Sequence, residues 1–179
     1  MSKIKFLILL LFLFPLKSSA QEYGEGLSHH QAGIAGSSLS SYGATYSYIF
    51  NSDYRIKSTV FAFYEDHDTY YDWIGTLGLE FQITLESASV TRFYGLIGGN
   101  YFRFVTSNVY NNSYYSTYRS EKDYAIGVGI GFELLAWKHL VFNLDGTLQY
   151  TVMRDDDYNY PYLTRYFGPG IGGGINYRF

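Results

Sequence analysis

Strict alternation of apolar and polar residues constrains the fold of this sequence more than any other feature. Over residues 124–134, one parity carries Tyr, Ile, Val, Ile, Phe and Leu, whereas the other carries Ala, three Gly and Glu. Successive side chains of a β-strand point to opposite faces, so this pattern indicates a strand with one apolar face and one small or polar face. The same alternation recurs over 71–85, 140–152 and 167–179. These stretches predict an all-β chain.

Four further stretches are strand-like but less regular. Residues 39–50 alternate, whereas 55–65 and 92–106 are apolar on both faces, which leaves open which of their side chains share a face. The stretch 31–36 is short and rich in Gly and Ala, so whether it is a true first strand also stays open. Together the stretches predict eight strands. Several are as long as the roughly 9–11 residues that a tilted strand needs to cross a bilayer.

The N-terminus has the three parts of a secretory signal. Lys3 and Lys5 precede an apolar stretch over 6–14, and Ser18-Ser19-Ala20 supplies small residues for cleavage before Gln21. The apolar stretch is too short for a membrane helix, which needs about 20 residues. We therefore expect a signal peptide over 1–20 and a β-barrel domain over 21–179.

The connections between the expected strands alternate in length. Those at 51–54, 86–91 and 137–139 are short, whereas those at 65–70, 107–122 and 154–164 are longer and polar. Short turns on one rim and longer loops on the other are typical of outer-membrane barrels. The first connection, near 37–38, departs from this rule because it is short on the long-loop side. The sequence thus predicts an eight-stranded antiparallel up-and-down transmembrane β-barrel.

The distribution of side chains between the two faces favours a membrane barrel over a soluble one such as a lipocalin. The polar parity is rich in Gly and poor in long charged residues, which suits the narrow interior of an eight-stranded barrel better than a solvated surface. The apolar parity has aromatic residues near both strand ends and aliphatic ones between them, as the two interfaces of a bilayer require. The aromatic residues are Trp73, Tyr124, Tyr150 and Phe167 near the long loops, and Phe50, Trp137, Tyr177 and Phe179 near the short turns.

With its N-terminal signal, eight alternating strands and closing Tyr177-Arg178-Phe179, the chain resembles the small OmpA/OmpX-type outer-membrane β-barrels of diderm bacteria. The resemblance implies a location in the bacterial outer membrane and contact with outer-membrane lipid. It also implies that Tyr177 and Phe179 form the terminal aromatic signal recognised by the barrel-assembly machinery. It implies no particular activity.

Composition removes several function classes. The sequence has no cysteine, which excludes a disulfide framework, a thiolate metal site and a lipidated cysteine anchor. The formal net charge of −3 and the lack of a basic run argue against a nucleic-acid partner. We expect no cofactor and no metal.

The longest connection, 107–122, carries the main functional hypothesis. It holds Tyr110, Tyr114, Tyr115 and Tyr118 among Asn and Ser. Tyrosine offers a large contact area at low entropic cost, so this composition suits binding of an extracellular glycan or protein. The alternative interpretation is an extension of the flanking strands above the membrane.

Two acidic clusters are candidates for catalysis or cation binding, and a solvated polar loop is the favoured interpretation of each. His67, flanked by Glu65, Asp66 and Asp68, is the one histidine expected outside, and a lipid-modifying enzyme of the deacylase or acyltransferase type needs such a base near the lipid ester. No His-x-Ser pair accompanies it on a strand. Asp155-Asp156-Asp157 has hard oxygen ligands for Ca²⁺ or Mg²⁺ but lacks the EF-hand spacing, so a solvated loop is the competing interpretation.

Charges of both signs are expected inside the barrel. The candidates are Asp72, Glu80, Glu133 and Asp145 against Arg178 and Lys57. Buried charges must pair, so we expect an ion-pair network that plugs the lumen; a narrow channel is the alternative. The sequence predicts a non-catalytic protein that is structural or binds surfaces through its outer loops.

Overall fold

The structure is a computed structural model and describes residues 29–50, 53–66, 70–109, 116–137, 139–156 and 162–179. Within these residues the chain forms eight β-strands, and each strand pairs antiparallel with its neighbours in sequence order until β1 meets β8. The strands are β1 (His30–Ser37), β2 (Ser41–Ile49), β3 (Tyr54–Asp66), β4 (Tyr70–Ser87), β5 (Thr91–Val109), β6 (Ser116–Ala136), β7 (Leu140–Asp155) and β8 (Tyr162–Arg178). The predicted fold class is therefore confirmed. The expected signal peptide lies outside the described residues.

The strands of the outer rim are longer than the sequence indicated. We expected a loop over 107–122, but β5 runs to Val109 and β6 starts at Ser116, with these two residues paired. The expected loop over 154–164 shrinks in the same way, since Asp155 still pairs with Tyr162. The polar composition of these stretches hid their strand character, because a ladder outside an apolar environment needs no apolar face.

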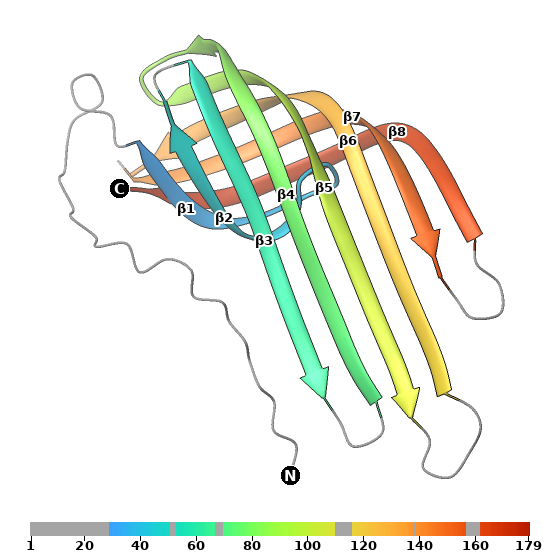
Figure 1. Cartoon of the computed structure of the whole chain (residues 1–179). Helices are drawn as coiled ribbons and strands as arrows, with labels where there is room; N and C mark the ends of the chain where they lie inside the picture. Colours follow the sequence, from blue (N-terminus) through green and yellow to red (C-terminus); the bar gives the residue numbers. More distant parts are fainter. Residues whose placement is uncertain (1–28, 51–52, 67–69, 110–115, 138, 157–161) are drawn as a thin grey trace.

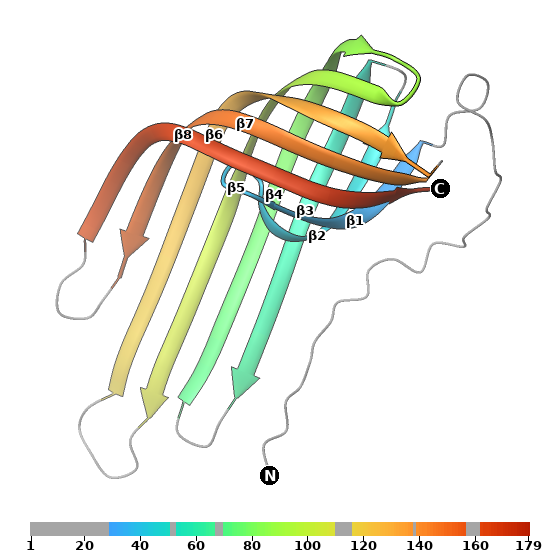
Figure 2. The ribbon, with the colours of Figure 1, turned by 180° about the vertical axis from the view of Figure 1, so that it is seen from behind.

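Two strands are much shorter than the rest, and this shapes the molecule. Figure 1 shows β1 and β2 at one end only, whereas β3 to β6 continue far beyond them. Figure 2 shows the same from behind, with β8 leaving its neighbour β1 on the way to the loop end. The wall is thus closed around the end that holds the short turns and the C-terminus.

The faces of the two ambiguous strands are resolved by burial. Arg55, Lys57 and Thr59 of β3 are buried, while the alternating Ile56 and Val60 are exposed. On β5 the buried set is Arg92, Tyr94 and Leu96, and the exposed set includes Phe93 and Ile97. Both strands therefore place their polar or bulky buried set in the lumen, which is the space enclosed by the barrel.

The β1–β2 turn does not reach the outer rim but folds into the lumen. Leu39 and Ser40 are completely buried, and Leu39 packs with Tyr94 and Leu96 of β5. The side-chain amide of Asn100 donates to the carbonyl oxygens of Ser38 and Leu39, at 3.2 and 3.0 Å.

Two more strands hold this turn. Thr76 of β4 is hydrogen-bonded to the Ser41 hydroxyl, and the amide of Ser38 donates to the carbonyl of Ile171 on β8 at 3.1 Å. The unexpectedly short first connection is therefore a turn that lies across the barrel, touching β4, β5 and β8.

Beyond this turn the barrel wall opens. Pairing between β2 and β3 ends at Ala44 with Val60, and pairing between β1 and β8 ends at Ser37 with Gly172. In the described part of the chain, the remaining stretches of β3 and β8 have no ladder partner on that side. The outer half is thus a curved sheet of six strands rather than a closed ring.

A substitution at Gly78 tests the position of the β1–β2 turn. A Cβ atom at Gly78 would lie 1.8 Å from the carbonyl oxygen of Ser40, so Gly78→Val must displace the turn. We expect a loss of about 1–3 kcal/mol of unfolding free energy, as for other overpacked interiors. Urea unfolding in lipid vesicles, followed by tryptophan fluorescence, measures it.

Gly146 provides the matched control. A Cβ atom there meets nothing within 4 Å, so Gly146→Val should leave the unfolding midpoint nearly unchanged. Equal losses at both glycines would contradict a turn packed against β4.

Candidate functional site

Charged side chains meet in the closed half of the lumen and form its first cluster around Glu133. Arg55 reaches Glu133 with two guanidinium nitrogens, at 2.5 and 3.2 Å. Arg92 approaches the same carboxylate at 3.6 Å and lies over the Tyr94 ring, 4.7 Å from its centroid. Gln31 of β1 accepts a hydrogen bond from Arg55 at 3.0 Å. A bidentate arginine–carboxylate pair of this kind is among the stronger polar contacts a protein makes.

A second pair extends the cluster across β3, β4 and β5. Lys57 and Glu80 form an ion pair at 2.8 Å, with exposed fractions of 3% and 2%. Gln82 donates to Glu80 at 2.9 Å and accepts from Arg92 at 3.1 Å. The chain Lys57–Glu80–Gln82–Arg92–Glu133–Arg55 therefore links the whole set into one network.

The remaining expected lumen charges lie around this network. Asp145 of β7 is buried near Lys57 and Glu80, but among the described residues no ion pair joins it to a basic side chain, contrary to the expected pairing. Arg178 of β8 is also buried and adds positive charge near Glu133. Asp72 has the lumen parity but lies on the outer, open part of β4.

Sequence reasoning missed the two arginines that hold Glu133. Arg55 and Arg92 stand in the two stretches whose faces were left open, because apolar residues occupy both parities there. The alternation of Arg55, Lys57 and Thr59 against Ile56 and Val60 was the available signal. Tyr94 gave no signal, since a tyrosine is equally common on a lipid-facing surface.

The network and the turn lie together in the closed half of the lumen. Leu39 and Ser40 are completely buried there, and the paired Arg55, Glu133, Lys57 and Glu80 are buried beside them. The plug stays a prediction, with the narrow channel as its alternative.

Asp155 and Asp156 do not converge on a common site. Asp155 faces the lumen side and pairs with Arg119 at 3.0 Å, whereas Asp156 faces outward and accepts from Lys122 and Arg154 at 2.9 and 2.6 Å. Asp157 lies outside the described residues. These pairs replace the solvated loop that the sequence indicated, and among described residues no group of three His, Asp or Glu could hold a metal ion.

The two contacts of Asp156 lie at the outer end of the strands. The hydrogen bonds from Lys122 and Arg154 hold the pKa of this carboxyl below its usual value. The cluster is therefore intact above the ordinary carboxyl range, and it is lost only as the pH falls through the lowered pKa.

The terminal aromatic residues form a stacked set at the short-turn rim. The Tyr177 ring lies 6.5 Å from that of Phe179 and 5.2 Å from that of His139. The amide of Phe179 donates to the carbonyl of His30 at 3.2 Å, which joins the C-terminus to the first strand. Their role as an assembly signal stays a prediction.

The structure describes only some of the remaining expected site residues. Tyr110, Tyr114 and Tyr115 lie outside the described residues, as does His67, and only the backbone of Tyr118 is described, within β6. His29 and His30 contact Tyr48 and Tyr46 at the short-turn rim. In the described part of the chain, no helix is long and apolar enough to cross a membrane.

Comparison with known proteins finds distant structural likeness alone. No family model matches the chain, and no curated protein matches its sequence. One similar solved structure is the N-terminal β-barrel domain of OprF from Pseudomonas aeruginosa, with 14% identity, a TM-score of 0.40, and 85% of this chain and 99% of that one covered. Another is Ail, the attachment invasion locus protein of Yersinia pestis, with 16% identity, a TM-score of 0.39, and coverage of 84% and 93%.

The fold itself is established by the strand order of this chain. Eight antiparallel strands follow one another in sequence order and are closed by β1 on β8, which is the fold that the resemblance implied.

The Glu133 network predicts a large effect of a single charge. Replacing Arg55 by Met removes the bidentate partner of Glu133 and leaves it with the more distant Arg92 and Arg178, and breaking a buried pair in this way should cost about 3–5 kcal/mol. Replacing Glu133 by Gln in the Arg55→Met background should recover part of that loss, because the unpaired charge is removed. Urea unfolding in lipid vesicles measures both.

An exposed pair serves as the control. Arg119 and Glu121 form an ion pair at the outer end of β6 with side chains that are 47% and 32% exposed. Glu121→Gln should change stability by no more than about 1 kcal/mol. Similar losses of unfolding free energy in the Arg55 and Glu121 variants would show that the lumen pair stabilises the protein no more than an exposed pair does.

Proposed function

We propose that this protein is a non-catalytic integral β-barrel of the bacterial outer membrane, with a sealed lumen. The observation that carries the proposal is its inverted polarity. Lys57, Glu80 and Arg55 are buried, while Phe167 and Ile171 on β8 are 68% and 70% exposed. A water-soluble barrel has the opposite arrangement, because exposing apolar surface to water is unfavourable.

The extent of the apolar surface along the strands supports a location in a bilayer. On β6 the outward-facing residues from Tyr124 to Leu134 are all exposed and apolar, and the stretches Trp73–Ile83 of β4 and Phe142–Val152 of β7 have the same length. That length agrees with the roughly 9–11 residues of a membrane-crossing strand. We call this surface the apolar band.

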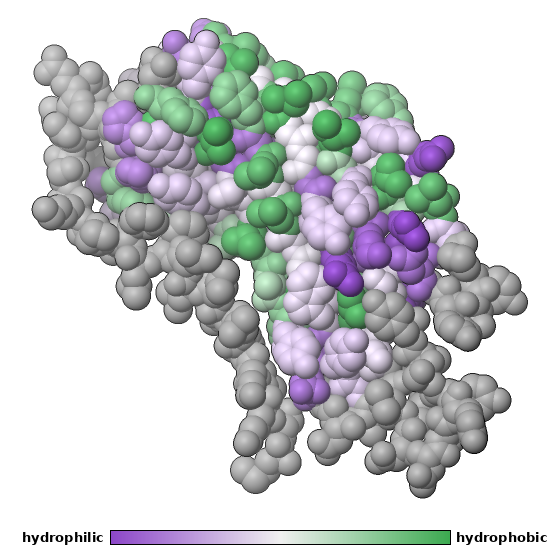
Figure 3. Space-filling model, in the orientation of Figure 1, coloured by the Kyte–Doolittle hydropathy of each residue, from purple (hydrophilic) through white to green (hydrophobic). Residues whose placement is uncertain are grey.

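Aromatic residues border the apolar band. Tyr101 and Tyr124 are cross-strand partners with ring centroids 5.1 Å apart near its outer edge, and Tyr177 lies at the other end. Figure 3 shows hydrophobic residues over the middle of the molecule and a hydrophilic cluster over the outer ends of β6 and β7. Amphipathic aromatic rings at both edges suit the two bilayer interfaces.

Cell fractionation with a heat-modifiability gel tests the location. The folded protein should remain with the outer membrane after osmotic shock and change mobility on boiling. Release of the protein together with the periplasmic proteins would contradict the proposed location.

A charge placed in the apolar band tests its depth. Val128→Arg lies in the middle of the band and should cost about 2–4 kcal/mol in lipid, whereas Leu134→Arg at its edge should cost about 0–1 kcal/mol. Both side chains are exposed in the absence of lipid, so they differ only in depth. Equal costs in vesicle refolding would argue against a bilayer around this surface.

Surface binding is a second candidate function, favoured by the extension of the β5–β6 hairpin. The ladder of these strands continues beyond the apolar band to Val109 and Ser116. Arg119, which pairs with Glu121 and Asp155, fixes its base. A hydrogen-bonded hairpin is a suitable support for Tyr110, Tyr114 and Tyr115, which follow its last described pair in sequence, since binding residues on a rigid scaffold lose little entropy.

Shortening the hairpin separates this role from the fold. Deleting Asn111–Thr117 should leave the heat-modifiable barrel in the membrane and abolish attachment of expressing cells to host cells or glycan surfaces. Attachment that equals the undeleted protein across such surfaces would leave the structural role alone.

A further inference from the structure

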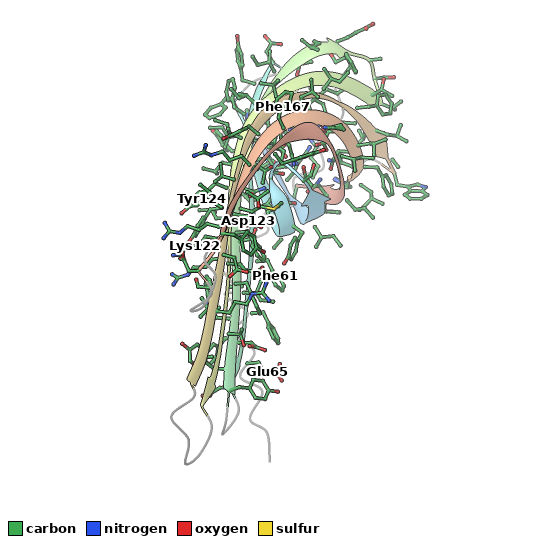
Figure 4. All side chains as sticks on the ribbon, turned by 90° about the vertical axis from the view of Figure 1, so that its right-hand side faces the viewer. Phe61, Glu65, Lys122, Asp123, Tyr124 and Phe167 are labelled. Carbon is green, nitrogen blue, oxygen red and sulfur yellow. The ribbon has the colours of Figure 1, made fainter. Side chains whose placement is uncertain are left out.

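Three basic side chains lie side by side on the outer face of the barrel, just beyond the apolar band. Arg103, Lys122 and Arg154 are direct cross-strand partners on β5, β6 and β7, and we call them the cationic row. Their parity is that of the outward-facing residues. Figure 4 shows Lys122 and Tyr124 on one side of the sheet and Phe61 on the other. In a bilayer, the cationic row lies at the height of the outer headgroups.

The cationic row keeps a surplus of positive charge. Asp156 is the carboxylate that contacts it, and this one group holds both Lys122 and Arg154 in place. Among the described residues no carboxylate pairs with Arg103. Its guanidinium lies 5.9 Å from the centroid of the Trp73 ring, and its Nε is buried with no hydrogen-bond partner. Among the described residues, the row thus sets three positive charges against one carboxylate.

An apolar groove continues from the cationic row toward the membrane centre. It has a volume of about 570 Å³, and we call it the outer groove; its lining includes Leu77, Leu79, Ile97, Gly99, Tyr101 and Ile126. Gly99 lies between Leu79 and Ile126 in the strand register, so the wall is recessed where its neighbours carry large side chains.

The recess depends on glycine. A Cβ atom at Gly99 would come within 2.4 Å of the carbonyl oxygen of Ala125, so a larger residue cannot stand there without moving the backbone. On the same face of β5, Tyr101 and then Arg103 follow Gly99 toward the outer rim. Tyr101, which lines the groove, therefore lies between the groove and Arg103, and this surface of the barrel is apolar at one end and cationic at the other.

We infer that this surface binds a phosphorylated acyl glycolipid of the outer leaflet. The phosphate lies on Arg103 and Lys122, where charge-assisted hydrogen bonds and the planar fork of arginine favour it, and an acyl chain fills the outer groove. The apolar groove is what selects a lipid over a free anion, because a soluble phosphate has nothing to place in it. This inference rests on the proposed membrane location.

Trp73 lies next to the site and reports on it. The chain has two tryptophans, so Trp137→Phe leaves Trp73 as the only one. This variant is refolded into phosphatidylcholine vesicles, and diphosphoryl lipid A is added in rising mole fraction while Trp73 emission is followed. We expect a saturable change in emission.

The double substitution Arg103→Gln with Lys122→Gln removes the proposed phosphate contacts. It should raise the half-saturating mole fraction at least about tenfold, which corresponds to about 1.4 kcal/mol. The matched control is Arg119→Gln, which removes a charge at similar height from the lumen side and should leave the titration unchanged. A gel shift on boiling verifies that each variant is folded; if the double variant is not, Arg103→Gln alone should raise the mole fraction at least about threefold.

Several results would overturn the inference. An identical titration in the folded double variant, or an equal loss with Arg119→Gln, would show that the cationic row does not hold the phosphate. Inorganic phosphate that reproduces the emission change at equal concentration would show binding of an anion without its acyl chain. Failure of the unsubstituted protein to insert into vesicles at all would instead count against the proposed function.

Discussion

The narrow lumen is the constraint on which the rest of this structure depends. An eight-stranded barrel encloses only enough space for its own side chains, and this one encloses charged ones. Arg55 and Glu133, and Lys57 and Glu80, can be there only because each has an opposite charge within ion-pair distance. Glycine on a neighbouring strand leaves room for the largest of the lumen side chains: a Cβ at Gly131 would lie 2.3 Å from the ring of Tyr94, its ladder partner. With the polar side chains inside, the outer face is free to be apolar.

The short β1–β2 hairpin determines where the lumen is closed. Because β1 ends at Ser37 and β2 starts at Ser41, the turn lies inside the barrel. There Asn100 satisfies two of its carbonyl groups, so the buried backbone is not left without partners. Beyond the turn, the edges of β3 and β8 lack ladder partners within the described residues. At membrane depth such edges must be buried in protein or line a water-filled space.

The sequence predicted the fold well because alternation depends on a local property of strands. In 124–134, 140–152 and 167–179 the alternation alone predicts which side chains share a face, with no information about the neighbouring strands. The strand register agrees with that prediction. The stretch 31–36 lies within β1, which could be recognised only from its partners, because small residues on both faces carry no pattern. The site was less predictable. Glu80 and Glu133 were visible as lumen charges, but Arg55 and Arg92 were hidden in stretches that are apolar on both faces, and the buried turn at Leu39 has no local sequence signal.

The side chains in the lumen also restrict where this protein can meet a partner. Leu39, Tyr94 and the ion pairs lie in the closed half, so a ligand there would have to displace them. The outer face differs, because its apolar side chains are exposed and no carboxylate pairs with Arg103 among the described residues. Binding to that face leaves the ion pairs of the lumen intact. In a barrel of this size, the outer surface and the extended strand ends are therefore the places where recognition is physically easiest, and the position of the cationic row directly above a recess in the wall follows that logic.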